Sequence, residues 1–209
     1  MTGVSSSTAL WYASRATGVV SLVLLSAAVI IGIVVSRPAC PRGAPGGRPP
    51  GSARLPRFVV LGLHRNVSLL AVAFVAVHVL TAVADSFVSI SLAAAIIPFA
   101  SAYEPLWMGL GAVSLDLMVA VIVTSLLRRH IGHRVWRALH WLAYVSWPVA
   151  VAHGIGSSTD LRRAGPLLDL TIACIAAVVI ALAWRVTRAR VPQPRSRPAP
   201  ELIDAGARR

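Results

Sequence analysis

Residues 58–83, FVVLGLHRNVSLLAVAFVAVHVLTAV, decide the fold. The stretch is apolar and long enough to cross a bilayer, since a transmembrane helix needs about 20 apolar residues. It carries two histidines, His64 and His78, and one arginine, Arg65. Strongly coordinating or ionisable side chains inside a membrane span are costly and are functional by default. The stretch therefore predicts a membrane helix whose histidines carry a function.

Four further stretches are apolar over a comparable length: 16–35, 105–127, 138–155 and 166–184. Residues 86–100 are apolar but too short to cross and return, so we expect an interfacial or re-entrant helix closed by Pro98. The predicted fold class is all-α, an integral membrane bundle of five transmembrane helices with a candidate interfacial helix at 86–100. Residues 1–15 are predicted to be a short extracytoplasmic N-terminus, 16–184 the membrane domain, and 185–209 a basic cytoplasmic tail disordered by composition.

Composition and charge agree with the membrane class. The chain has 209 residues, 56% of them hydrophobic, and a net charge of +13 carried by 20 basic side chains, all arginine. Such a charge in a soluble protein would suggest nucleic acid, but these arginines cluster at the ends of apolar stretches. Sixteen lie in 36–57, 128–137 and 185–209, and three lie on the other side of the predicted spans. The positive-inside rule then predicts a multi-pass protein of the cell membrane with its N-terminus outside and its C-terminus in the cytoplasm. This placement of the arginines excludes nucleic acid as a partner.

The spacing of four histidines is the main functional signal. His64 and His78 are 14 residues apart, which puts them within about 40° of one helix face and about 21 Å apart along the axis. His140 and His153 are 13 apart, about 140° out of phase on a straight helix. Pro148 lies between them and removes one backbone hydrogen bond, so we expect a local kink that restores a common face. The two pairs then match in depth, His64 with His140 and His78 with His153.

Each matched pair offers two neutral imidazoles to one planar iron macrocycle clamped between helices. A bare zinc or copper ion would need three or four ligands around one point. We therefore predict two haem b groups, with the four histidines as axial iron ligands. The alternative is that the histidines only pack between helices and form hydrogen bonds with their neighbours. The predicted ligands are His64, His78, His140 and His153.

Two segments, LHRNVSLLAVAFVAVHVLTA (63–82) and VWRALHWLAYVSWPVAVAHGIG (135–156), resemble the ferric reductase-like transmembrane domain. That family includes ferric reductases and the membrane core of NADPH oxidases, and the haem-bearing membrane subunit of the methionine sulfoxide reductase system is related to it. The resemblance covers roughly residues 10–185. It implies an oxidoreductase subunit that passes electrons across the bilayer from a cytoplasmic donor to an extracytoplasmic acceptor.

The chain departs from the family in two respects. No Gly-rich dinucleotide fingerprint follows Trp184, so the expected electron donor is a separate protein, a flavin supplied by a partner, or a quinol. Six spans are commoner in the family than the five predicted here. The expected acceptor is an extracytoplasmic protein, ferric iron or oxygen, and membrane lipid is the surrounding partner. A quinol-linked cytochrome b and a non-redox transporter or assembly scaffold are the alternative functions.

Three charged residues have two interpretations each. Arg15 and Arg65 lie at opposite ends of the predicted bundle and could bind haem propionates, or they could extend to the lipid headgroups. Asp116 is expected to be buried near the middle of its span. It could assist a ligand histidine or carry protons, or it could form an ordinary hydrogen bond between helices.

Overall fold

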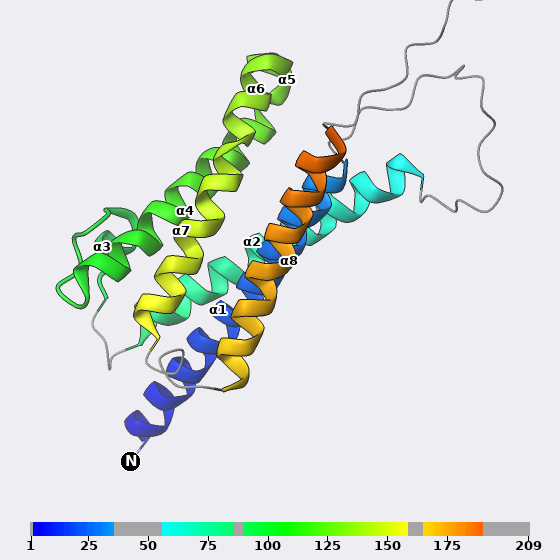
Figure 1. The fold of residues 1–209 in the computed structure, drawn as a ribbon. Helices are drawn as coiled ribbons and strands as arrows, with labels where there is room; N and C mark the ends of the chain where they lie inside the picture. The colour runs from blue at the N-terminus through cyan, green and yellow to red at the C-terminus, as the bar shows by residue number, and fades with distance from the viewer. Residues whose placement is uncertain (1, 36–55, 86–89, 159–164, 190–209) are drawn as a thin grey trace, which may run out of the picture.

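The computed structural model describes residues 2–35, 56–85, 90–158 and 165–189, and all regular structure in these ranges is helical (Figure 1). The four longest helices are α1 (Thr2–Val35), α2 (Arg57–Ala84), α4 (Pro105–Leu126) and α8 (Pro166–Ala189). The shorter ones are α3 (Leu92–Ile96), α5 (Arg128–Ile131), α6 (His133–His140) and α7 (Leu142–Ser157).

Four segments are long and apolar enough to cross a membrane: Thr8–Val35, Arg57–Ala84, Pro105–Leu126 and Pro166–Thr187. These correspond to four of the five predicted spans. The length and composition of the helices are those of a membrane protein. The all-helical fold class is therefore confirmed.

Both ends of the described chain are more helical than predicted. The helix α1 begins at Thr2 rather than near residue 16, and no proline before Pro38 interrupts it. The helix α8 continues to Ala189, so the first five residues of the predicted disordered tail are helical. The remainder of that tail and the predicted loop 36–57 up to residue 55 lie outside the described residues.

The predicted span 138–155 is divided between α6 and α7, and α7 has 16 residues. Trp141 joins the two helices with helical dihedral angles, φ −64° and ψ −21°. Its N–H donates to the Ala138 carbonyl at 3.2 Å and its carbonyl accepts from the Tyr144 N–H at 2.9 Å. Such bonds across three residues tighten the helix to about 120° per residue, against about 100° in an α-helix. The added rotation reduces the phase difference between His140 and His153, so the tight turn at Trp141 contributes to their alignment, and α7 continues through Pro148.

The segment predicted as an interfacial helix is helical only over the five residues of α3. Ser91 caps it, because its hydroxyl accepts from the Ala94 N–H at 3.1 Å. The helix ends before Pro98, as predicted, and α3 packs on α4. Residues 86–89 lie outside the described residues.

The helices pack as two groups in contact along α1 and α7. In Figure 1, α1 lies with α2 and α8, and α4 lies with α7 and α3. The buried apolar positions are mostly small, which lets helix backbones approach closely, as at other membrane helix interfaces. They are Ala28, Ile33, Ala71, Ala94, Ala112, Val151, Cys174 and Val178.

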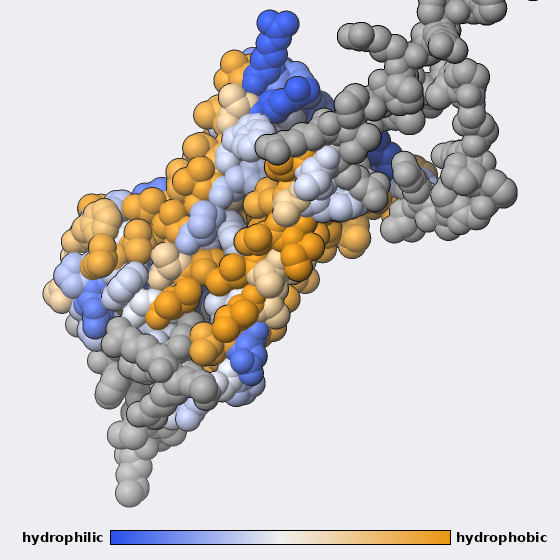
Figure 2. All heavy atoms as spheres, viewed as in Figure 1, coloured by the Kyte–Doolittle hydropathy of each residue, from blue (hydrophilic) through white to orange (hydrophobic). Residues whose placement is uncertain are grey.

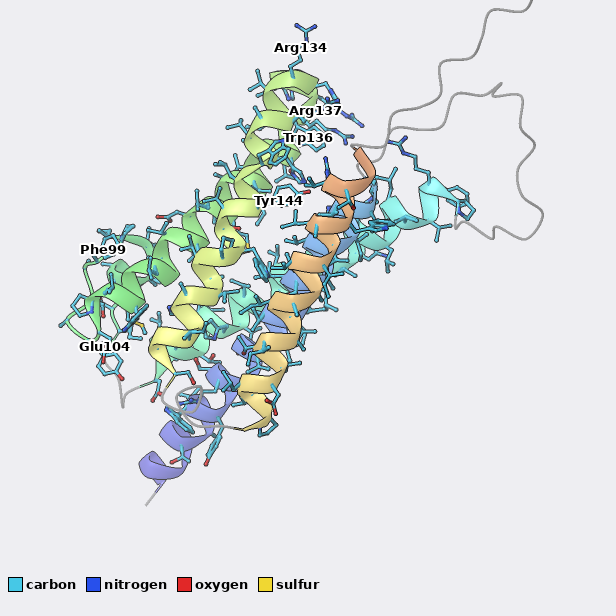
Figure 3. The ribbon with its side chains drawn as sticks, viewed as in Figure 1. Phe99, Glu104, Arg134, Trp136, Arg137 and Tyr144 are labelled. Atoms are coloured by element: carbon cyan, nitrogen blue, oxygen red, sulfur yellow. The ribbon has the colours of Figure 1, made fainter. Side chains whose placement is uncertain are left out.

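Large apolar side chains cover the outside of the helices. Phe58, Leu80 and Ile180 are among those exposed, and Figure 2 shows hydrophobic residues over the middle of the bundle. Figure 3 places Arg134, Trp136 and Arg137 at one end and Glu104 toward the other. An apolar middle with polar ends suits a lipid surrounding.

Candidate functional site

Two pairs of histidines meet between α2 and the α6–α7 segment. The ring centroids of His64 and His140 are 6.4 Å apart, and those of His78 and His153 are also 6.4 Å apart. We call His64 and His140 the inner pair and His78 and His153 the outer pair, after the sides of the membrane that the arginine pattern of the sequence predicts for them. The structure thus brings together the four side chains that the sequence predicted to pair, in the predicted combinations.

The distance between the rings fits one metal ion between each pair. An imidazole nitrogen binds a transition metal at about 2 Å, and the ring centre lies about 1 Å behind it, so two imidazoles on opposite sides of one ion have centres about 6 Å apart. The planes within each pair are 73° and 69° from parallel. The two levels therefore have nearly the same geometry.

Backbone carbonyls orient both rings of the outer pair. Nδ1 of His78 lies 2.7 Å from the Ser14 carbonyl on α1, and Nδ1 of His153 lies 2.7 Å from the Trp107 carbonyl on α4. A carbonyl only accepts, so each Nδ1 carries the hydrogen. In a neutral imidazole the other nitrogen, Nε2, is then unprotonated and free to bind a metal. A hydrogen bond of this kind fixes the tautomer and raises the basicity of a ligating histidine.

Glycines lie against three of the four rings. A Cβ at Gly111 would be 2.8 Å from Cε1 and Nδ1 of His153, and one at Gly18 would be 3.1 Å from the same atoms of His78. A Cβ at Gly32 would be 3.3 Å from Cε1 of His64. These glycines are not among the predicted site residues, although Gly18 and Gly32 have the 14-residue spacing of His64 and His78.

The inner pair has a different environment. Nδ1 of His64 and Nδ1 of His140 are buried without a well-formed hydrogen bond within the described residues, although the backbone of Ala28 lies close enough to interact with the His64 ring. Instead, the His140 ring stacks on Trp136, with centroids 5.1 Å apart and planes 27° apart. The guanidinium of Arg128 lies 5.6 Å from the Trp136 ring. Aromatic stacking thus positions one inner ring where a backbone hydrogen bond positions each outer ring.

Other contacts fix the relative register of the helices. The Trp107 ring packs against Gly156 of α7, where a Cβ would overlap it. Ser114 of α4 donates to the Ser146 carbonyl at 3.1 Å. Trp147 of α7 donates from Nε1 to the Ser26 hydroxyl of α1 at 3.0 Å. These contacts hold α7 against α1 and α4, both midway between the two histidine levels and beside the outer level.

The structure places the three charged candidates differently from one another. Arg15 is half-buried at the level of the outer pair, since it follows Ser14 directly. Its guanidinium donates to the Ser158 hydroxyl at 2.9 Å and lies 4.5 Å from the centre of the Trp11 ring. Arg65 is exposed on α2 beside His64. The expectation that Asp116 is buried is wrong: its side chain is exposed on α4.

No family model, curated protein or solved structure matches this chain. The geometry of the histidine pairs is therefore the basis for a functional proposal.

Proposed function

We propose that this chain binds two b-type haems, one between the imidazoles of each pair, and transfers electrons across the membrane. The observation that carries the proposal is the common distance of 6.4 Å between ring centroids at both levels. Two aromatic rings can also pack edge to face at such distances without a ligand. The repetition of one geometry at two depths, on helices predicted to match in depth, favours a shared ligand over independent packing.

The donor set favours a macrocycle over a bare ion. Across the part of the chain that the structure describes, no three or more His, Cys, Asp or Glu side chains form a group that could hold a metal ion. A porphyrin supplies four nitrogens to the iron and needs only axial ligands from the protein. Two imidazoles at each level meet that need.

The proposed topology has five crossings, the fifth being supplied by α6 and α7 together. These helices and Trp141 cover residues 133–157, and about 20 helical residues suffice to cross the hydrocarbon core. With the N-terminus outside, the inner pair lies toward the cytoplasm with the α5–α6 arginines. The helix α3 then lies at the outer surface of the membrane.

The chain's own residues have three tasks in this function. Each bound haem would supply an iron that exchanges one electron. The paired histidines would hold the iron, and a haem held by two imidazoles suits electron transfer better than binding of a gas or substrate. The hydrogen bonds from Nδ1 keep the outer rings in the ligating tautomer. Arg15 and Arg65 are the candidates for the anionic propionates at the outer and inner levels.

Electrons would enter at the inner pair from a donor protein, flavin or quinol and leave from the outer pair to an extracytoplasmic protein or ferric iron. The exposed arginines at the cytoplasmic end would receive an anionic donor. They are Arg128, Arg129, Arg134 and Arg137.

Electron transfer through liposomes tests the proposal. The purified chain would be reconstituted with trapped ferricyanide, and dithionite would be added outside. We expect reduction of the trapped ferricyanide by the wild type and by His130→Ala, whose histidine is exposed in α5. We expect His153→Ala to reduce it no faster than empty liposomes do. A wild type that carries haem but stays at the empty-liposome rate would contradict electron transfer, and a wild type without haem would leave the scaffold or transporter alternative.

A further inference from the structure

We infer that Gly18 and Gly111 are positioning residues of the outer site, because their missing side chains expose the backbone carbonyls that orient His78 and His153. The inference rests on the proposed function and assigns it two residues that do not touch the iron.

The two contacts have the same construction on different helices. Ser14, whose carbonyl accepts from His78, precedes Gly18 by four residues, and Trp107, whose carbonyl accepts from His153, precedes Gly111 by four. In an α-helix, the side chain at i+4 leans toward the N-terminus and covers the preceding turn, which begins at residue i. A glycine at i+4 therefore leaves the carbonyl of residue i open to a side chain from another helix.

The space at both glycines is occupied by the ring itself. A Cβ at position 111 would lie 2.8 Å from Nδ1 of His153, the atom that donates to Trp107. A Cβ at position 18 would lie 3.1 Å from Nδ1 of His78, the atom that donates to Ser14. Each ring is attached at Cβ and held by its hydrogen bond, so it has little freedom to move away. Any alanine at these positions displaces the nitrogen that fixes the tautomer.

A displaced ring has two measurable consequences. Loss of the Nδ1 hydrogen bond makes the imidazole a weaker donor, so the reduction potential of the outer haem rises. It also weakens the hold on the haem, so the occupancy of the outer site falls. The inner site should respond to neither substitution, because its histidines lie about 20 Å away along the helices.

The chain offers matched controls for both substitutions. Gly154 is adjacent to His153 and Gly62 is two residues from His64, and a Cβ at either position would meet no atom within 4 Å. Alanine is a better helix former than glycine at all four positions. The controls therefore carry the same change in helix propensity without the contact.

The experiment measures haem per chain and the midpoint potentials of the purified Gly111→Ala, Gly18→Ala, Gly154→Ala and Gly62→Ala variants. We expect Gly111→Ala to lose most of the outer haem. We expect Gly18→Ala, whose contact is looser, to keep part of it with a raised potential in one of the two titration steps. Both controls should match the wild type. If Gly111→Ala fails to fold, Gly18→Ala still provides the test.

Two results would overturn the inference in different ways. If the wild type binds two haems and Gly111→Ala and Gly18→Ala match the controls in occupancy and potential, the glycines do not position the ligands, and the proposed function stands. If the wild type binds no haem under any condition, the proposed function fails and the inference fails with it.

Discussion

The outer and inner histidine pairs share one distance and differ in what holds their rings. Both outer rings donate from Nδ1 to carbonyls of α1 and α4 at 2.7 Å. In the inner pair neither Nδ1 has a well-formed hydrogen bond among the described residues: the Ala28 backbone lies near His64, and the His140 ring stacks on Trp136. Both outer rings are thus held by backbone atoms, whereas His140 of the inner pair is held by a side chain at the arginine-rich end.

Because of this difference, we expect the two levels to respond to different substitutions. Backbone carbonyls of packed helices are rigid, so they hold a ligand in one orientation and one tautomer. A stacked indole holds a ring in place without fixing its tautomer. We therefore expect the outer site to be the more sensitive to changes in helix packing, and the inner site to changes at Trp136.

Removal of one ligand should give the largest effect. We expect His78→Ala to abolish the outer haem and to spare the inner one, and His64→Ala to do the reverse, because each proposed haem has its own pair of histidines. Pyridine haemochrome quantification of each purified variant would measure this, with His130→Ala as the control. Loss of both haems in either variant, at wild-type expression and helicity, would contradict two separate sites.

Replacement of Trp136 should give an intermediate effect confined to the inner site. An aromatic pair is worth about 1 kcal/mol beyond its buried area, so Trp136→Leu should weaken retention of the inner haem about fivefold. Trp136→Phe keeps a stacking ring and should restore most of it. Competition for haem with an excess of apomyoglobin would measure retention. An equal loss from both sites, or no difference between Leu and Phe, would show that stacking does not hold His140.

The smallest effect should come from a contact midway between the levels. The Ser26 and Ser21 hydroxyls each donate to the carbonyl four residues earlier in α1, and the Ser26 hydroxyl also accepts from Trp147. Hydrogen bonds between membrane helices contribute about 0.6 kcal/mol on average, so Ser26→Ala should be less stable than Ser21→Ala by about that amount. Unfolding in dodecyl sulfate would measure the difference. Unlike the other variants, Ser26→Ala should affect both haems equally, and a loss from one level only would contradict the comparison.

Much of the fold follows from the sequence because helix geometry is fixed. Long apolar stretches predicted four of the candidate spans, and the 14-residue spacing of His64 and His78 put them on one face of α2. The spacing of His140 and His153 required an interruption of the helix. Pro148 was predicted to supply it, but α7 continues through Pro148, and the tight turn lies at Trp141, where nothing in the neighbouring residues requires it.

The surroundings of the rings were not predictable in the same way. Which carbonyl meets Nδ1 of His153 depends on the register of α4 against α7, and that register is set by contacts such as Trp107 on Gly156. The exposure of Asp116 depends on which face of α4 turns toward α7. The 14-residue spacing of Gly18 and Gly32, equal to that of His64 and His78, was the one sequence feature that pointed to contacts with the rings. It becomes informative only when α1 is known to pack on α2.

The haem content of the purified wild-type chain tests the central claim most directly. Pyridine haemochrome quantification against protein concentration, with an electron paramagnetic resonance spectrum of the oxidised protein, should give two b haems per chain with low-spin iron, since two imidazoles bind each. A folded chain that stays colourless after haem supplementation, or that holds high-spin iron with an open axial position, would contradict it.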